Sequence, residues 1–371
     1  MKKWTILLAA VALVCFSVPA LAVDWSFYGS ARIYTFYVSN DLGDSTTTAG
    51  DDGDASLEWG NTIGNNSRIG FRAKADNVNG RVEIQLKGNE NGDPGTDITT
   101  ETRLIYGVWN FGAGKLKVGK DYTPVSQFIS GQVYDEDLGL LGIGTQYGNR
   151  TPQIAFSFGG FDIALIQQKD DDISTSGGVA TGGDRDSYLP KFEAGYAMSF
   201  DAWDFGIQGG YQYYSIETTT NDDVDVTSYT IGGNVGFNFG AAYAKAAVSY
   251  GQNWGQAAWG LNGSFTDGSN TYWDGVDDTD DTTSMMFALV AGMKATDMLK
   301  FEAGFGWRND DPDVNGLDDQ TAWALYAQSV ISMAPGVYIV PEVGYYDYGD
   351  QFNGDNAGSE FYLGAKWQID F

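Results

Sequence analysis

The end of the chain alternates strictly between apolar and polar side chains. From residue 361 to 371 the apolar positions are Phe361, Leu363, Ala365, Trp367, Ile369 and Phe371. The intervening polar positions include Glu360, Lys366 and Gln368. Side chains on a strand point to opposite faces in turn, so this run predicts a strand with an apolar medium on one side and water on the other. Its length matches a tilted strand of about ten residues that crosses a bilayer.

The same pattern recurs along the chain, and the runs are joined alternately by long and short segments. The short links lie at 76–80, 111–114, 159–160, 201–202, 240–241, 296–297 and 334–336; the long ones lie at 39–56, 88–100, 121–149, 168–187, 217–227, 252–283, 309–319 and 347–359. Bacterial outer-membrane barrels combine short periplasmic turns with long extracellular loops. The spacing therefore predicts an all-β fold, a transmembrane antiparallel β-barrel of sixteen strands with both ends on the periplasmic side.

Charged residues occupy one face of most predicted strands. In 299–308 the outward set is apolar, whereas Lys300, Glu302 and Arg308 share the other face. A dry core would not tolerate such charges unpaired, and a barrel of this strand number is wide enough for a water channel. Tyr28, Tyr34 and Trp109 are also expected on the polar faces.

The first 22 residues have the features of a cleaved secretory signal, with a basic start, an apolar run and a small-residue cleavage motif. Residues 23–371 are then expected to form a single barrel domain. Removing Lys2 and Lys3 leaves 19 basic against 49 acidic side chains, a net charge of −30. This acidity argues against nucleic acid as a partner. The chain has no histidine, and no constellation of nucleophile and base stands out, so we expect no enzyme.

Several segments resemble the general bacterial (Gram-negative) outer-membrane porins. The likeness begins at residues 66–72 (NSRIGFR), continues through 79–86 (NGRVEIQL) and 102–107 (TRLIYG), and extends over 111–124 (FGAGKLKVGKDYTP). It covers roughly the first third of the predicted mature chain, and the aromatic last strand adds a feature shared by many outer-membrane barrels. The resemblance implies a sixteen-stranded barrel, commonly a homotrimer. It also implies an inward-folded third extracellular loop whose carboxylates face a basic wall.

Carried over position by position, the resemblance assigns the residues of a pore constriction. The basic wall would be Arg32, Arg68, Arg72, Arg103 and Arg150, with Arg32 standing in because the matching position of the first strand is Ser30. The acidic loop would be Asp135, Glu136 and Asp137. Ten of the 19 mature basic residues lie between Arg32 and Lys120, which independently favours a one-sided basic wall. The alternative is that these arginines pair with nearby acids such as Glu83 and take no part in transport.

Acidic clusters in the long segments raise the question of bound cations. Asp311, Asp313 and Asn315 are spaced as in the first half of a calcium loop, with Gly316 at the turn. The closing glutamate is missing, so Asp318 or Asp319 would have to complete the site. Ca²⁺ at the acidic extracellular loops is therefore a hypothesis, beside plain solvated surface charge. An acidic channel mouth would also favour cations mildly.

These observations favour a channel for passive diffusion of small hydrophilic solutes and ions across a bacterial outer membrane. The alternatives are a substrate-selective porin for a sugar or another small nutrient, and a secreted calcium-binding all-β structural or adhesive protein. The expected partners are outer-membrane lipid, lipopolysaccharide and the barrel assembly machinery. By resemblance, the terminal Phe371 is expected to be the signal that this machinery reads.

Overall fold

The computed structural model describes residues 23–41, 56–59, 66–87, 99–168, 173–175, 178–180, 185–217, 223–260, 272–273, 279–352 and 354–371. The predicted signal segment, 1–22, lies outside them. The strands of the wall are β1 (Asp24–Asp41), β3 (Arg68–Lys74), β4 (Val78–Lys87), β5 (Thr99–Asn110), β6 (Lys115–Tyr122), β7 (Arg150–Phe158), β8 (Phe161–Ile166), β12 (Lys191–Ser199), β13 (Trp203–Glu217), β14 (Asp223–Phe239), β15 (Ala242–Gln252), β18 (Thr282–Lys294), β19 (Leu299–Pro312), β20 (Gln320–Ala334), β21 (Val337–Asp347) and β22 (Ser359–Asp370).

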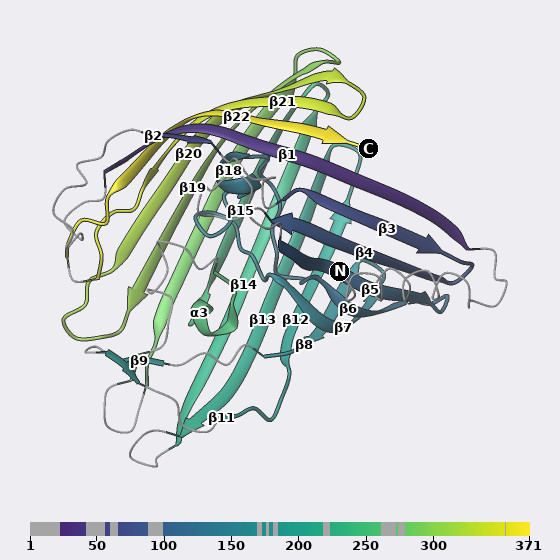
Figure 1. Ribbon diagram of the computed structural model, residues 1–371. Coiled ribbons are helices and arrows are strands. Elements are labelled where there is room, and N and C mark those ends of the chain that lie inside the picture. The colour runs from purple at the N-terminus through teal and green to yellow at the C-terminus, as the bar shows by residue number, and fades with distance from the viewer. Residues whose placement is uncertain are drawn as a thin grey trace, which may run out of the picture.

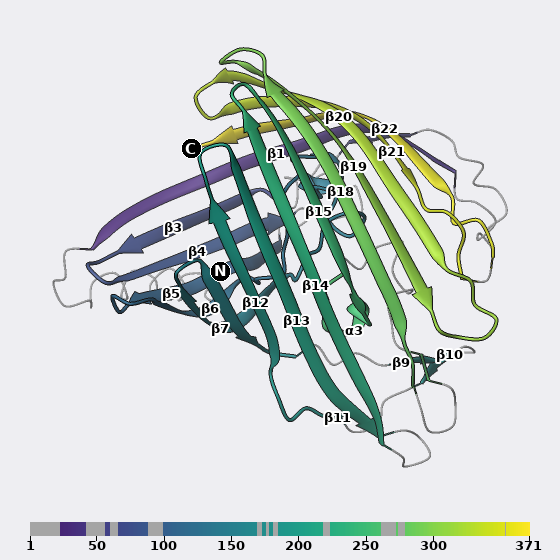
Figure 2. The ribbon, with the colours of Figure 1, turned by 180° about the vertical axis from the view of Figure 1, so that it is seen from behind.

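These sixteen strands form a closed antiparallel barrel (Figures 1 and 2), which confirms the predicted architecture. Each strand pairs with its neighbour in the chain, and the last pairs with the first from Ser30↔Asp370 to Asp41↔Ser359. The first strand pairs on its other side with β3. Closure satisfies the backbone groups that an open sheet would leave unpaired in lipid.

Shorter strands lie beyond the wall. β2 (Ser56–Trp59) pairs with β1, and β11 (Arg185–Asp186) pairs with β13. β9 (Ile173–Thr175), β10 (Gly178–Ala180), β16 (Tyr272–Trp273) and β17 (Thr279–Asp280) form a separate small sheet. None of the helices in the described part of the chain is long and apolar enough to cross a membrane.

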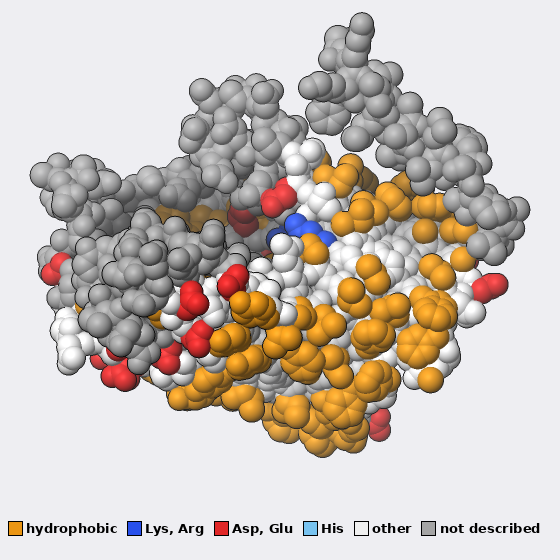
Figure 3. All heavy atoms as spheres, turned by 90° about the horizontal axis from the view of Figure 1, so that it is seen from below, with side chains coloured by type: hydrophobic (Ala, Val, Ile, Leu, Met, Phe, Trp, Pro, Cys, Tyr) orange, Lys and Arg blue, Asp and Glu red, His pale blue; other side chains and the backbone are white. Residues whose placement is uncertain are grey.

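The two faces of the last strand separate as its alternation predicts. The outward row of β22 is exposed, from Phe361 at 42% to Phe371 at 73%. Tyr362 and Lys366, on the inward row, are buried. Comparable apolar rows on the other strands give the wall its hydrophobic outer surface, part of which is visible in Figure 3. Apolar side chains can face out along the whole wall because the surrounding medium is lipid rather than water.

Trp109 departs from its predicted face because β5 contains a bulge. Glu83 pairs with Leu104 and Ile84 pairs with Thr102, so Arg103 has no partner in the register. A bulge inserts one residue and reverses the alternation that follows it. Arg103 and Leu104 are consequently both buried. Trp109 is 51% exposed on the lipid side, so the prediction that it lines the lumen is wrong.

The segment between β6 and β7 folds into the barrel. We call residues 123–149 the inner loop. Its side chains and backbone contact inward-facing residues of β1, β14, β19, β20, β21 and β22. The predicted inward fold of the third long segment is therefore present in the structure, and Figure 1 shows the inner loop inside the barrel.

Candidate functional site: a charged constriction inside the barrel

Carboxylates on the barrel wall hold the backbone of the inner loop. The Glu302 carboxylate on β19 accepts a hydrogen bond of 2.6 Å from the Gly131 amide. Glu342 on β21 accepts bonds of 2.8 Å from the amides of both Val133 and Tyr134. Amide groups of a loop have no strand partner, so carboxyl oxygens on the wall take the place of a sheet ladder. These contacts fix the height of the loop in the lumen.

Aromatic packing supports the same stretch. The ring of Tyr134 stacks on Tyr362 of β22, with ring centres 3.8 Å apart and planes 10° apart. The Gln132 side-chain amide donates to the hydroxyls of Tyr346 and Tyr362, at 2.7 and 3.0 Å. The rings remove apolar surface from water while their hydroxyls remain hydrogen bonded. The sequence pattern gave no sign that a loop would cover these two tyrosines.

The tip of the inner loop, α2 (Tyr134–Asp137), is a left-handed turn. Asp135, Glu136 and Asp137 have φ angles of 47°, 59° and 67°. Left-handed backbone costs roughly 1–2 kcal/mol per residue for side chains other than glycine. Three consecutive residues in this conformation must therefore be held by their surroundings.

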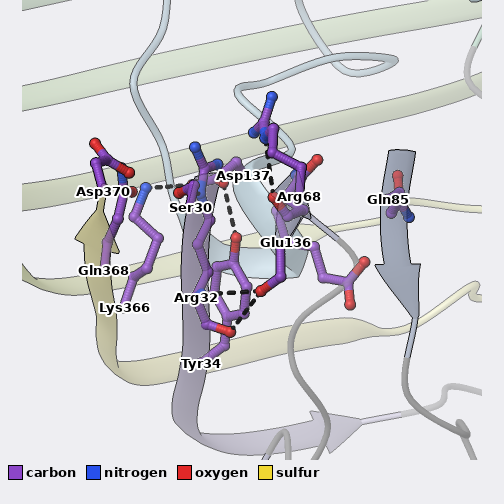
Figure 4. Close-up of polar contacts among 12 residues, drawn as sticks. Ser30, Arg32, Tyr34, Arg68, Gln85, Glu136, Asp137, Lys366, Gln368 and Asp370 are labelled. Carbon is purple, nitrogen blue, oxygen red and sulfur yellow. Dashed lines mark hydrogen bonds and ion pairs between the residues drawn. The ribbon is translucent and has the colours of Figure 1, made fainter. Parts of the chain in front are cut away.

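Asp137 supplies the strongest of these restraints. Its carboxylate accepts bonds of 2.5 Å from Arg32, 2.5 Å from Lys366 and 2.7 Å from the Tyr34 hydroxyl (Figure 4). Burial acts to raise the pKa of Asp137, but Lys366 and Arg32 outweigh it and hold the pKa below its usual value. The ionised carboxylate therefore stabilises the docked loop at neutral pH, and this stabilisation is lost as the pH falls through the lowered pKa.

Direct pairing of Arg32 with Asp137 refines the predicted arrangement of charges. Both residues were expected to face each other across water, whereas the structure joins them in an ion pair. Lys366 completes the cluster, and the sequence analysis placed it in the lumen without assigning it a role. Asp135 and Glu136, at the same tip, line the same open space as Asp137. The narrow lumen desolvates the Asp135 carboxyl and raises its pKa.

Two arginines of the predicted basic wall, Arg68 and Arg103, gather with Arg81 around one buried glutamate. Glu83 on β4 is 2.6 Å from Arg81, 2.8 Å from Arg103 and 3.4 Å from Arg68. It also accepts a 2.8 Å bond from the Tyr28 hydroxyl. Three guanidinium groups around one carboxylate leave a surplus of positive charge at the wall. The pairing with Glu83, which the sequence analysis gave as the alternative to a role in transport, is present for Arg68 and Arg103, and both arginines also line the cavity described next.

The two predicted charge groups line one cavity of about 500 Å³. Four of the five expected arginines are in its lining (Arg32, Arg68, Arg103 and Arg150), together with all three expected acids (Asp135, Glu136 and Asp137). Arg72 is not in that lining, and its guanidinium lies over the ring of Tyr28. Alternation predicts the face correctly, but four residues along a strand displace a side chain by about 13 Å. The prediction of Arg72 as a constriction residue is thus corrected.

A second segment enters the lumen that the sequence analysis did not identify. Residues 253–260, here called the α3 insert, contain α3 (Trp254–Ala257) and pack inside the barrel beside β12, β13 and β14 (Figure 1). Trp254 and Trp259 are fully buried. Gly210 on β13 leaves room for the Trp259 ring, because a Cβ at this position would lie 2.5 Å from that ring. The sequence does contain a signal for this insert. Two tryptophans and a pair of alanines in an otherwise polar loop indicate that the segment is buried.

Glu193 on β12 ties the α3 insert to the inner loop. Its carboxylate accepts a 2.8 Å bond from the Trp259 indole and a 3.2 Å bond from the Val125 amide. Lys191, two residues earlier on the same face, lies 3.4 Å from Glu193 and donates to the Ala257 carbonyl at 2.8 Å. Both side chains are fully buried. The Lys191–Glu193 ion pair therefore contacts both the α3 insert and the inner loop.

The candidate calcium residues do not converge in the structure. The Asp319 carboxylate accepts a 2.8 Å bond from the Asn309 amide, and the Asp318 backbone bonds to Phe352. Among the described residues, no group of three carboxylate, histidine or cysteine side chains could hold a metal ion. Other acidic clusters, such as 170–172, lie outside the described residues. Calcium binding at the loops stays an untested prediction.

Comparison with protein families identifies the chain. The family described as Gram-negative porin matches residues 9–351, which is most of the sequence. The chain belongs to the Gram-negative porin family. It is accordingly an outer-membrane channel for small solutes, in agreement with the closed barrel and the charged constriction. Comparison with curated proteins finds no match.

Solved structures with the same fold are distant in sequence. The outer-membrane channel DcaP of Acinetobacter baumannii is 15% identical, with a TM-score of 0.69 over 95% of this chain and 99% of that one. The anion-selective porin from Comamonas acidovorans is 14% identical, with a TM-score of 0.60 over 94% and 100%. OmpF of Salmonella typhi is 12% identical, with a TM-score of 0.59 over 95% and 99%. At these identities the porin shares the fold with them, and its solutes must be argued from its own residues.

Proposed function

We propose that this porin is a passive diffusion channel for small hydrophilic solutes and ions, with a mild preference for cations. The observation that carries the proposal is the cavity in which the inner-loop acids meet the basic wall. Its lining holds four arginines and four carboxylates, the fourth being Glu101. Charges of both signs around water orient dipolar solutes and penalise apolar ones that cannot replace their hydration. Such a site selects solutes by size and polarity and does not require a chemical reaction.

The preference for cations is supported by charge outside the constriction. The lining itself is balanced, but the predicted mature chain carries a net charge of −30. Fields from exposed charges extend about 8 Å at physiological ionic strength, so acidic loops at a channel mouth concentrate cations there. The balanced constriction limits the effect to a mild one. The anion-selective Comamonas porin provides a contrast within the same fold.

We expect a salt gradient of potassium chloride across a bilayer containing the purified porin to give a reversal potential on the cation-selective side. The preference for cations should weaken on acidification. Because its pKa is raised, the Asp135 carboxylate becomes protonated and neutral at a higher pH than usual. Asp135→Asn should make the pH dependence shallower, whereas Asp297→Asn, on a periplasmic turn, should leave it unchanged. A chloride preference at neutral pH would contradict the proposal.

A substrate-selective channel is the second candidate. Phe128 of the inner loop is 54% exposed and lines the constriction cavity, where a channel that only sieves has no need of an apolar ring. Saturation of the ion current by one solute class distinguishes selective binding from free diffusion.

We also propose the assembly state and the partners. The porin forms homotrimers in the outer membrane, its lipid-facing rows contact acyl chains, and its acidic loops meet lipopolysaccharide. Assembly proceeds through the barrel assembly machinery, with Phe371 as the recognised residue. Support comes from the exposed ring of Phe371, while its amide and carbonyl already pair with Gly29 at 3.0 and 2.7 Å.

Replacing Phe371 with alanine should reduce the yield of folded barrel in cells more than it reduces single-channel conductance. The substitution keeps both backbone bonds to Gly29, so it tests the ring alone. Heat-modifiable migration of outer-membrane extracts measures the yield. Phe361→Ala, on the same lipid-facing row, is the matched control and should assemble normally. Normal yield from the Phe371 variant would refute the assigned role.

A further inference from the structure

Two arginines of the constriction have few partners. Arg150 has no carboxylate within ion-pair distance among the described residues, and its guanidinium lies 5.6 Å from the centre of the Tyr122 ring. Arg68 donates from Nε to the Asn66 carbonyl at 3.0 Å. Its contact with Glu83 is a long 3.4 Å, and that carboxylate makes shorter bonds to Arg81 and Arg103. Arg68 and Arg150 therefore keep donors for a bound anion.

An aromatic corner adjoins these arginines. The ring of Phe128 meets Tyr122 edge-on at 5.0 Å and Tyr147 edge-on at 6.1 Å. All three rings line the same cavity as the two arginines. Tyr147 is buried, whereas Phe128 is 54% exposed. An apolar ring held by neighbouring rings and left open to the lumen offers a fixed surface for another ring.

We infer that the constriction contains a binding site for aromatic carboxylates, with the ring of the solute against Phe128 and its carboxylate between Arg68 and Arg150. The inference rests on the proposed channel function and names a solute class that the channel retains briefly during passage. Arginine holds a carboxylate through two parallel hydrogen bonds, which makes the guanidinium groups suited to this role. A solute with a ring but no carboxylate contacts only Phe128, and a solute with a carboxylate but no ring contacts only the two arginines.

The cavity also suits the solute in size. Its volume of about 500 Å³ lies within the range of small-molecule sites, and its walls combine an apolar surface with a few placed polar groups. Arg32 is already paired with Asp137 at 2.5 Å, and Arg103 with Glu83 at 2.8 Å. The anion is thus directed to the two arginines beside the aromatic corner.

The test uses the purified full-length porin in planar bilayers, with benzoate as the probe. Benzoate should reduce the potassium chloride current saturably. Acetate, which lacks the ring, and benzyl alcohol, which lacks the charge, should need much higher concentrations. Phe128→Ala should raise the half-saturating benzoate concentration about tenfold. Phe156→Ala, on the lipid-facing side of β7, is the matched control and should leave it unchanged.

Lysine substitutions separate the arginine geometry from its charge. Arg68→Lys and Arg150→Lys keep the positive charge but lose the two-point contact with a carboxylate. Both should therefore weaken the block by benzoate and by acetate, while benzyl alcohol, which has no carboxylate, behaves as before. They also test the site if Phe128→Ala fails to fold. Equal block by benzoate and acetate, or the same benzoate response in all of these variants, would overturn the inference. Absence of any salt current from the folded wild-type protein would instead overturn the proposed channel function.

Discussion

Replacing Glu193 with alanine should lower the stability of the folded barrel by about 3–5 kcal/mol, the cost of leaving a buried charge without its partner. The charge left behind is Lys191, which is 1% exposed beneath the α3 insert. The variant also loses the acceptor for the Trp259 indole and the Val125 amide. We therefore expect the α3 insert and one end of the inner loop to detach, and the pore to widen.

Two measurements separate stability from pore size. Denaturant unfolding in detergent reports the first, and exclusion of polyethylene glycols of graded size in bilayers reports the second. Phe192→Ala, the lipid-facing neighbour of Glu193, is the control and should affect neither strongly. Lys191→Met combined with Glu193→Leu should recover much of the stability, because apolar side chains can replace a buried ion pair at little cost. The double variant should still admit larger polymers, and a wild-type exclusion limit would show that the glutamate does not hold the loops.

Replacing Glu342 with alanine should release the middle of the inner loop. Two buried amides, of Val133 and Tyr134, lose their acceptor, at about 1–3 kcal/mol each. The left-handed turn that follows is strained and depends on this docking. We expect larger and noisier single-channel currents, with the barrel itself still closed by its strand pairing.

Two variants define what Glu342 contributes. Glu342→Gln keeps one acceptor oxygen but presents an amide group to the second backbone amide, so its currents should be intermediate. Val343→Ala, the next residue on the lipid-facing row, should behave as wild type. Quiet, wild-type currents from the alanine variant would mean that Tyr134–Tyr362 stacking and the Asp137 ion pairs suffice to hold the loop.

The alternation of apolar and polar residues was enough to predict the wall. Strand number, closure of β22 on β1 and the lipid-facing rows follow from a period of two, since one face must meet lipid and the other water. The acidic tip of the inner loop was also foreseen, because Asp135, Glu136 and Asp137 form the one acidic cluster of that segment after Asp121. Resemblance to porins contributed the idea that the segment folds inward.

What the sequence did not reveal are relations between distant parts of the chain. Periodicity cannot detect a bulge, so Trp109 was placed on the wrong face. Periodicity predicts the face of a strand but not the position along the barrel axis. Arg72 was therefore grouped with Arg68, although it lies four residues further along β3, towards its C-terminal end. Periodicity also cannot say which loop will cover which inward residue. Glu302 was expected on the water-facing side of its strand, but it accepts a hydrogen bond from the inner loop. Glu193 and Glu342, to which the sequence gave no role, do the same.

The anchors of the inner loop come from strands far apart in the sequence. Arg32 is near the N-terminus, Glu342 and Lys366 are near the C-terminus, and Glu193 lies midway. The loop cannot find all of them until the last strand has joined the first. A partly inserted barrel would therefore be an unselective hole, and discrimination between solutes is acquired at the final step of assembly.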